Sequence, residues 1–565
     1  MTHSTFNRAA WSKGSGAVRV LQPKISAEES RYYPDNMTAD TTSSNKKRIA
    51  IVGGGAAGVS TAWSLARSVH EKVDVTIIEP CPSLGGVACT KYLDNQQFLN
   101  YGVQGGTPAS HRNIIAFLKE FNEDIDDAHL SVSFGKGPYH WTNYQDSPLQ
   151  QTLQKDIRRF GTLLKWISRL EFVTLFLSID TVLEWACLSQ EFRDRMVYPL
   201  VALFFGTGNQ TPHMSAAVVA RVFNDPSLAL FEYSPDRLID SEPTNFAFKS
   251  LDQFYNGKVR PFLEDKGVKV LTSHRVDSVV SRSRKDGVTL QISNLAGSTD
   301  TDCRAGGDQK LLSNDSLLPL QDAAQVLPES STESSQQGWE ELFDEIVFAC
   351  PANVALQILG QNATFWERRI LGSVEYFHDL SVTHTDRAYM TKYYEDVEKE
   401  RAIYFIKTYE QDPKLLEMGF DLSGYQSSIS KGIINQSSPE QQQPERVFQT
   451  IFLDKKRKKD LWSLDEIDDN KIIDRSWWSA FAHTMKHFRS VVPFVWLLHR
   501  QNAVQATHTY YAGSWMLINT HDIAVVSGLA VAQRLGAPYP FADNSLALAL
   551  YKTFWMVGHL TVWRK

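Results

Sequence analysis

A compact apolar run enters a glycine-rich turn in the stretch Arg48-Ile-Ala-Ile-Val-Gly-Gly-Gly-Ala-Ala-Gly58. Gly53, Gly55 and Gly58 fit the pattern Gly-x-Gly-x-x-Gly. The first glycine permits the tight turn, the second lets the backbone approach a pyrophosphate, and the third lets a helix pack on the sheet. Ala56 and Ala57 begin that helix, whose N-terminal N–H groups and dipole favour bound phosphate. The stretch therefore predicts the phosphate-binding turn of a dinucleotide site.

A second strand is expected over residues 73–78, and it ends at Glu79. A carboxylate about twenty residues beyond the last glycine accepts hydrogen bonds from ribose hydroxyls in this type of site. The same negative charge repels a 2′-phosphate. The glycine pattern alone is a weak signal, but its position between two β-like runs strengthens it.

The segment after the second strand distinguishes an FAD site from an NAD site. Glu79-Pro-Cys-Pro-Ser-Leu-Gly85-Gly86 resembles the Glu-x(5)-Gly-Gly segment of the flavin-containing amine oxidase, phytoene desaturase and protoporphyrinogen oxidase superfamily. The resemblance implies that Gly85 and Gly86 lie against the pyrophosphate of FAD. Val87 stands where many members have Arg, which removes one charged phosphate contact. Gly102 and Val103 match the backbone that passes beside the flavin ring in this superfamily.

A second resemblance lies some 450 residues further along the chain. Residues 510–515 and 519–528 look like the C-terminal motif of the same superfamily, an aromatic-Ala-Gly turn followed by a helix. It implies that Gly513 and Ser514 meet the ribityl chain and pyrophosphate, with Ser514 in place of the usual acid. Asp522 and Ile523 would begin the helix that points at the flavin. Val276 matches the residue that contacts adenine. The resemblance spans residues 47–545 and is closest to predicted amine-oxidase-like flavoproteins of bacteria and fungi.

These motifs predict an α/β fold with a Rossmann-type FAD-binding domain that is split in sequence, and with an α+β substrate domain. Its FAD-binding parts are expected at 46–105, 250–360 and 505–545, and its substrate-domain parts at 106–249 and 361–504. Two low-complexity stretches, 296–338 and 424–446, are expected to be surface insertions because their composition cannot bury enough apolar surface. Residues 1–45 are expected to form a disordered arm, and 546–565 an apolar C-terminal helix.

Composition excludes several functional classes. The net charge of -6 over 565 residues provides no basic footprint for nucleic acid. Five cysteines form neither a CxxC pair nor a zinc spacing, which suits a reducing compartment. No charge-free apolar run is long enough to span a bilayer. We therefore expect a cytoplasmic protein, with peripheral membrane contact through the C-terminal helix as a further hypothesis. Oligomeric state is left open.

Aromatic and histidine side chains cluster over residues 477–488 at helical spacing, and we interpret them as a packed face. His483 and His487 lie four residues apart, but the surrounding pattern is not that of a metal site, and we expect no metal. Amine oxidases of this superfamily hold a Lys near the flavin on a strand that we place at 379–385. That segment has no Lys. His384 and His521 are the candidate acid/base residues, because His titrates near neutrality.

The resulting hypothesis is an FAD-dependent oxidoreductase that oxidises, desaturates or isomerises a fairly apolar small molecule. An amine oxidase that releases peroxide is one alternative. A flavin-binding partner protein without turnover is the other.

Overall fold

The computed structural model describes residues 46–563, except 94–96, 206–207, 226–231, 240–241, 243, 296–337, 430–445 and 456–458. Lys46–Lys565 forms one compact unit. The expected N-terminal arm at 1–45 lies outside the described residues.

The glycine-rich turn joins a strand to a helix as expected. β1 (Lys47–Val52) leads into α1 (Ala56–Ser68), and β2 (Val73–Glu79) follows. β1 and β2 are parallel and are buried along most of their length, as apolar strands covered on both faces should be. These elements form the βαβ unit that the sequence predicts.

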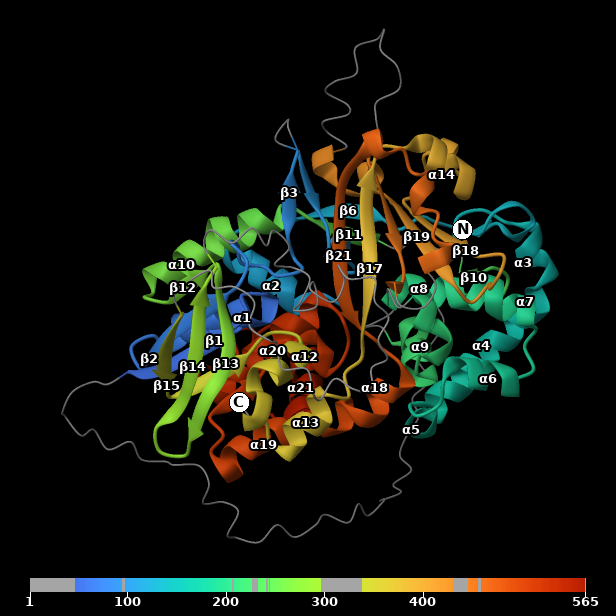
Figure 1. Ribbon diagram of the computed structural model, residues 1–565. Helices are drawn as coiled ribbons and strands as arrows, with labels where there is room; N and C mark the ends of the chain where they lie inside the picture. The colour runs from blue at the N-terminus through green and yellow to red at the C-terminus, as the bar shows by residue number, and fades with distance from the viewer. Residues whose placement is uncertain are drawn as a thin grey trace, which may run out of the picture. The chain divides into compact units, whose positions relative to one another are not determined.

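The β1–β2 pair belongs to a five-stranded parallel sheet of order β12-β2-β1-β16-β22 (Figure 1). Its other strands are β12 (Lys269–Thr272), β16 (Glu345–Phe348) and β22 (Thr509–Tyr511). Strands far apart in the chain thus share one sheet, so the nucleotide-binding part is split in sequence.

An antiparallel meander lies between β12 and β16 in the chain. It consists of β13 (His274–Ser283), β14 (Gly287–Asn294) and β15 (Gly338–Phe343). Ser293 pairs with Gly338, so the two ends of the stretch 296–337 meet at the end of one hairpin. The stretch itself, predicted as an insertion, lies outside the described residues.

A second sheet supports the other part of the fold. Its order is β21-β17-β20-β19-β18-β7-β8, and it is antiparallel except between β18 and β7. Its strands are β7 (Val132–Phe134), β8 (Trp141–Thr142), β17 (Tyr376–His384), β18 (Tyr404–Thr408), β19 (Leu416–Asp421), β20 (Phe448–Phe452) and β21 (Ile472–Phe481).

A group of helices shares an apolar core with one face of this sheet. These helices are α3 (Pro148–Thr152), α4 (Gln154–Arg169), α5 (Glu171–Thr174), α6 (Ile179–Trp185), α7 (Gln190–Phe192), α8 (Tyr198–Phe205) and α9 (Ala216–Asn224). The sheet's opposite face holds a smaller core built on β17, β18 and β20. This two-sheet arrangement agrees with the two-domain fold expected from the sequence.

Shorter elements complete the two parts. The strands are β3 (Thr90–Tyr92), β4 (Phe98–Asn100), β5 (Gly105–Gly106), β6 (Ile125–His129), β9 (Tyr233–Ser234), β10 (Leu238–Ile239) and β11 (Thr244–Phe248). The helices are α2 (Arg112–Glu120), α10 (Arg260–Asp265), α12 (Ala352–Leu359), α13 (Phe365–Leu371), α14 (Arg387–Tyr393), α15 (Leu422–Tyr425) and α18 (Met485–Ser490).

Two sequence-based expectations are wrong in detail. The aromatic stretch expected to be helical from 477 is strand β21 up to Phe481, with Trp477 and Trp478 contacting opposite cores of the second sheet. The insertion expected from 424 begins later. Tyr425 and Ile429 are buried in the core that the helical group shares with the second sheet, and Tyr425 donates a hydrogen bond to the Phe246 carbonyl.

The C-terminal part completes the nucleotide domain. α19 (Val495–Gln505), α20 (His521–Arg534) and α21 (Ser545–His559) pack together, and α20 also packs along α1. α1 and α20 approach so closely that a Cβ on Gly528 would collide with the Ala57 carbonyl oxygen. α21 buries Tyr551, Phe554 and Trp555 in the core. In the part of the chain that the structure describes, no helix combines the length and apolar character needed to cross a membrane.

Candidate functional site

The three glycines of the turn have different surroundings. Gly53 has φ +107°, and a Cβ there would lie 2.7 Å from the Ala349 carbonyl oxygen. A Cβ on Gly58 would collide with the Gly53 carbonyl oxygen. A Cβ on Gly55 would meet only the Cα of Gly86, at 3.9 Å. Gly53 and Gly58 are therefore required by the turn, while Gly55 borders open space.

The N-terminus of α1 faces this space without a competing side chain. Gly55 is the N-cap, no side chain caps the helix, and the first turn contains no acidic residue. Ala56 and Ala57 are buried at the start of the helix. Because α1 has 13 residues, its dipole and first N–H groups provide a site for phosphate.

The second glycine pair closes over the turn. Gly85 forms an isolated parallel bridge with Gly55, and the Gly85 N–H donates to the Gly54 carbonyl at 2.9 Å. Gly85 and Gly86 have φ +115° and +61°, a backbone conformation that favours glycine. The two motifs predicted to meet the pyrophosphate therefore lie against each other.

Glu79 has a structural task that the sequence did not indicate. Its carboxylate accepts the Gly54 N–H at 2.6 Å and the Cys81 N–H at 2.9 Å, and so fixes both glycine loops. Burial raises the pKa of Glu79, and the hydrogen bonds from Cys81 and Gly54 oppose this shift. Each carboxylate oxygen has a second lone pair for a ribose hydroxyl. Val276, the predicted adenine neighbour, is buried on β13. β13 follows β12 in the chain, and Thr272 at the end of β12 pairs with Glu79.

Gly102 and Val103 lie beside the same loops. A Cβ on Gly102 would collide with the Val87 carbonyl oxygen, so the chain at 102 packs directly on the segment after Gly86. Val103 is half-buried against the core of the nucleotide domain. Val87, which replaces the common Arg, is 61% exposed.

The C-terminal motif adds the next side of the site. The Gly513 N–H donates to Ser527 Oγ at 2.8 Å, and Ser514 Oγ donates to Asn519 Oδ1 at 3.2 Å. Trp515 is buried, and its indole Nε1 has no hydrogen-bond partner among the described residues. A buried donor without a partner is costly, so this N–H indicates a place for a ligand acceptor.

Asp522 and Ile523 lie in the first turn of α20, as the sequence predicts. The Asp522 carboxylate accepts the Ile114 N–H at 2.7 Å and Asn113 Nδ2 at 3.0 Å, and it therefore caps α2 instead of facing the site. Burial raises the pKa of Asp522 to about 6. The Ile523 N–H donates to Thr520 Oγ1 at 3.1 Å. Both residues hold the domain together.

His521 lies in the cofactor cradle. Its Nε2 is 2.5 Å from the Tyr255 hydroxyl, and the Tyr255 ring lies 3.3 Å from where a Cβ on Gly85 would be. His521 Nδ1 has no hydrogen-bond partner in the described part of the chain. Burial lowers the pKa of His521 to about 3, so the ring is neutral at ordinary pH. Tyr255 was not predicted, because no local motif marks it.

His384, the other candidate acid/base residue, lies on the second sheet, away from the glycine loops. It is fully buried at the end of β17, where Nε2 is 3.0 Å from Thr450 Oγ1 and Nδ1 accepts the Asp386 N–H at 3.1 Å. Burial lowers its pKa to about 4. Since both ring nitrogens are bonded within the protein, His384 has a structural role.

The opposite face of the same strand is polar and was not predicted. Thr383 pairs with Gln449 across β17 and β20, and Gln104 Nε2 donates to Gln449 Oε1 at 2.7 Å. We call Ser381, Thr383, Gln449 and Gln104 the polar strip. Four polar atoms of this strip are buried without hydrogen-bond partners in the described structure: Ser381 Oγ, Thr383 Oγ1, Gln449 Nε2 and Gln104 Oε1. Because Gln104 follows Val103, the strip borders the segment predicted to pass beside the flavin.

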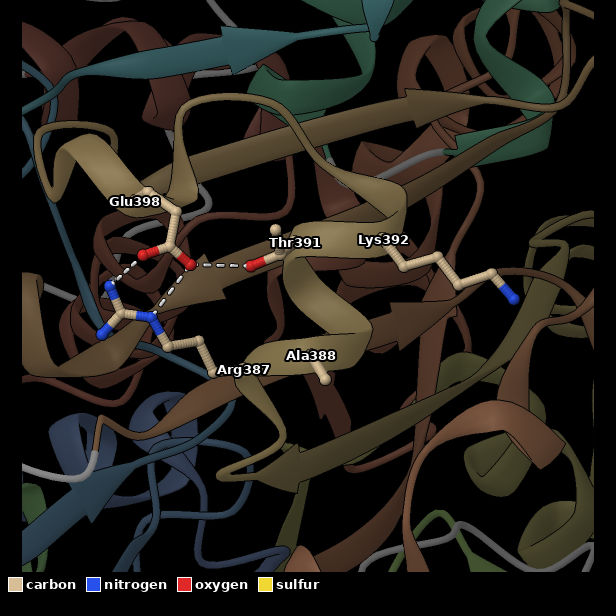
Figure 2. Close-up of a pocket in the computed structure, with 5 residues that line it drawn as sticks. All are labelled: Arg387, Ala388, Thr391, Lys392 and Glu398. Carbon is tan, nitrogen blue, oxygen red and sulfur yellow. Dashed lines mark hydrogen bonds and ion pairs between the residues drawn. The ribbon is translucent and has the colours of Figure 1, made fainter.

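A separate surface hollow of about 520 Å³ lies over α14 and is lined by Arg387, Ala388, Thr391, Lys392 and Glu398 (Figure 2). Three of its side chains bond to one another, with Arg387 Nη2 at 2.6 Å and Thr391 Oγ1 at 3.0 Å from Glu398, while Lys392 pairs with Glu466. It shares no residue with the glycine loops. No group of three or more His, Cys, Asp or Glu side chains in the described ranges is placed to hold a metal ion.

The glycine cradle fits FAD. Open space lies in front of Gly55, an uncapped helix N-terminus faces it, and Trp515 Nε1 and His521 Nδ1 are unpaired buried atoms beside the loops. Gly53–Gly58, Glu79, Gly85 and Gly86 would hold the dinucleotide, and Gly102, Val103, Gly513 and Ser514 its flavin half.

Comparisons with known proteins agree with this geometry. Residues 51–121 match the family model of the NAD(P)-binding Rossmann-like domain. Over 87 residues the chain is 34% identical to the L-amino-acid oxidase of Crotalus adamanteus and to the L-amino-acid oxidase apoxin-1 of Crotalus atrox. Each match covers 15% of this chain and spans only 16% of the oxidase.

Solved structures share the fold over most of the chain. A putative protoporphyrinogen oxidase from Exiguobacterium sp. 255-15 has a TM-score of 0.53 at 14% identity and covers 86% of this chain and 98% of its own. A CLA-producing fatty acid isomerase from P. acnes has a TM-score of 0.52 at 15% identity, covering 88% and 100%. A putrescine oxidase bound to putrescine has a TM-score of 0.52 at 14% identity, covering 87% and 99%. The matched segment shows a Rossmann-like nucleotide-binding domain, and the solved structures share the fold of the chain. With the glycine cradle, which fits FAD as the cofactor, they support an amine-oxidase-like FAD-dependent oxidoreductase.

Proposed function

We propose that this protein is an FAD-dependent oxidoreductase that oxidises, desaturates or isomerises a largely apolar small molecule carrying one uncharged polar group. The observation that carries the proposal is the polar strip, whose buried atoms lack partners beside the segment that follows Val103. Bound FAD supplies a two-electron acceptor for hydride from a substrate carbon. The chain's own task is to orient that carbon and exclude water.

The character of the polar strip supports an uncharged substrate group. Its members are hydroxyls and carboxamides, which offer donors and acceptors without charge. The charged side chain nearest along β21, Asp474, is paired with Lys91 at 2.6 Å. An ammonium or carboxylate on the substrate would have no unpaired counter-charge within the strip. The aromatic and aliphatic residues around the strip, such as Trp478, favour an apolar remainder.

An amine oxidase is the second candidate, and the matched L-amino-acid oxidases and the shared fold of putrescine oxidase favour it. Against it, β17 has no Lys between Asp379 and His384, where amine oxidases of this superfamily hold one. A flavin-binding protein without turnover is the remaining alternative, and it predicts a flavin spectrum that no substrate changes.

The decisive experiment compares two isosteric variants on opposite faces of β17 and β20. Thr383→Val removes a hydroxyl that has no hydrogen-bond partner among the described residues, so folding stability should be unchanged or slightly raised. Ligand affinity should fall about tenfold, the scale of one hydrogen bond in a buried site. Thr450→Val removes the hydroxyl that contacts His384, so it should lower the melting temperature and leave ligand affinity unchanged.

The probes are oleic acid amide, oleyl alcohol, putrescine and L-leucine, added anaerobically while the flavin absorbance is followed. Perturbation or bleaching by the oleyl compounds, weakened in Thr383→Val, supports the proposal. Rapid bleaching by putrescine or L-leucine, with peroxide on admission of air, would establish the amine oxidase instead. A spectrum that no probe and no chemical reductant alters would favour the binding protein without turnover.

A further inference from the structure

Five large apolar side chains are exposed where α4 gives way to α5 and the segment after it. We call them the apolar tip: Trp166, Leu170, Phe172, Val173 and Phe176. Phe172 is 91% exposed and Val173 59% exposed, while Trp166, Leu170 and Phe176 are between 42% and 54% exposed. α5 is a single turn that contacts α4 and α9, at one end of the helical group (Figure 1).

This cluster of exposed apolar side chains needs an explanation. Single exposed apolar residues are common, but a run of them within eleven residues marks a surface that contacts something else. Thr174, in the same turn, is buried, and its hydroxyl donates to the Ile167 carbonyl of α4 at 3.0 Å, which ties the turn to that helix. The tip is thus a fixed projection of apolar side chains.

Unpaired cations flank the tip. Lys165 and Arg169 are exposed, and neither forms an ion pair within the described residues. The Arg169 guanidinium lies 5.3 Å from the centre of the Trp166 ring. Glu171 is the single acid between residues 165 and 177, and it pairs at 2.5 Å with Arg221, which also pairs with Asp225 at 3.3 Å. The apolar tip therefore has a positive rim.

We propose that the apolar tip inserts into the headgroup region of an anionic membrane, with Lys165 and Arg169 binding lipid phosphates or carboxylates. Aromatic and aliphatic side chains with a Lys/Arg border are the chemistry of interfacial membrane contact. A symmetric contact between two copies of the tip would bring like charges together, which disfavours a second copy as the occupant.

The proposal moves the membrane contact away from the C-terminal helix. α21 buries its Tyr551, Phe554 and Trp555, and its exposed side includes Lys552 and Thr553 between Leu546 and Met556. This exposed side is mixed, whereas the apolar tip carries adjacent apolar residues. Membrane contact through the tip does not depend on the identity of the oxidised substrate.

The test uses the full-length, FAD-loaded protein and sedimentation with extruded vesicles. Wild-type protein should bind phosphatidylcholine vesicles that contain phosphatidylserine, and bind pure phosphatidylcholine more weakly. The double variant Phe172→Asp/Val173→Asp should lose at least about tenfold in partitioning, because two apolar side chains no longer enter the interface. Lys165→Glu/Arg169→Glu should abolish the preference for phosphatidylserine.

Two matched controls locate the contact. Trp185→Asp changes an apolar side chain that is 70% exposed on α6 outside the tip, and Met556→Asp changes one that is 55% exposed on α21. Both controls should bind vesicles like the wild type. FAD content and circular dichroism should be equal in all variants, because every changed side chain is at the surface. These readouts are independent of substrate turnover.

Three outcomes would overturn the proposal. Equal vesicle binding by wild type and Phe172→Asp/Val173→Asp would exclude the tip. Loss of binding in Met556→Asp alone would return the contact to α21. Concentration-dependent dimerisation without vesicles, abolished by Phe172→Asp/Val173→Asp, would show that a second copy covers the tip.

Discussion

Gly55 and Gly58 lie three residues apart in one turn, yet a methyl group would have opposite consequences at the two positions. The φ of Gly55 is -71°, which any residue adopts, and a Cβ there meets almost nothing. A Cβ on Gly58 would collide with the backbone of Gly53. Gly55 is therefore required by the ligand, and Gly58 by the fold.

This contrast yields a paired prediction. Gly55→Val should fold with a melting temperature close to that of the wild-type apoprotein, but it should bind FAD at least a hundredfold more weakly. Gly58→Ala should destabilise the protein by about 3 kcal/mol or more, because overpacking against backbone cannot be relieved by a side-chain movement. In each variant, flavin absorbance per chain measures FAD binding and thermal unfolding measures stability. Normal FAD content in Gly55→Val would contradict the phosphate assignment.

Glu79 serves both the ligand and the fold. The ribose assignment predicts weaker FAD binding in Glu79→Ala, and the hydrogen bonds to Gly54 and Cys81 predict a second effect on the apoprotein. Two buried N–H donors would lose their acceptor, so unfolding free energy should fall by about 1–3 kcal/mol without FAD present.

Titration with FAD and urea unfolding of the apoprotein separate the two effects of Glu79→Ala. An apoprotein as stable as the wild type would show that the carboxylate does not fix the loops. Unchanged FAD affinity would remove the ribose assignment. Glu79→Gln keeps an acceptor oxygen and should lie between wild type and Glu79→Ala in both measurements.

At the scale of elements, the sequence correctly predicts those helices and strands that depend on residues close together in the chain. The β1–α1–β2 unit follows from an apolar run, a glycine turn and a second apolar run within about thirty residues. β21 was misread because Trp477, Trp478 and Phe481 also fit a helical spacing, while the alternation of the strand is hidden by apolar residues on both faces.

Long-range contacts had no sequence signal at all. Gln104 and Gln449 are 345 residues apart in the chain, and Tyr255 and His521 are 266 apart. The tertiary fold brings these pairs together. The contact of His384 with Thr450, 66 residues away in the chain, likewise has no sequence signal.

The β14–β15 hairpin provides an element-scale prediction. Ser293 and Gly338 are cross-strand neighbours, so replacing residues 296–337 with a short Asn-Gly turn should preserve the pairing. FAD content should be unchanged, and unfolding free energy should stay equal or rise by up to about 2 kcal/mol, because a shorter loop costs less closure entropy. Loss of flavin on replacement would show that the stretch contributes to the site.

At the scale of the whole molecule, buried neutral histidines link its stability to pH. Burial lowers the pKa to about 3 for His483, His499 and His521, and to about 4 for His111, His384 and His487. In the unfolded chain these groups titrate near pH 6.5. The stabilisation is therefore complete above about pH 6.5, and it is lost progressively as the pH falls toward the folded-state values, because only the unfolded state binds protons there.

His499 is the best position at which to test this linkage. Its two ring nitrogens have no hydrogen-bond partner in the described structure, and its ring lies 4.3 Å from that of His559, so Phe can replace it as a packing residue. Between about pH 6 and pH 4 the wild type should lose unfolding free energy steeply. His499→Phe should lower that slope by about 1.4 kcal/mol per pH unit, the value for one proton. Urea unfolding at a series of pH values measures the slope. Identical slopes in the two proteins would mean that His499 is protonated in the folded state, against the burial that keeps it neutral.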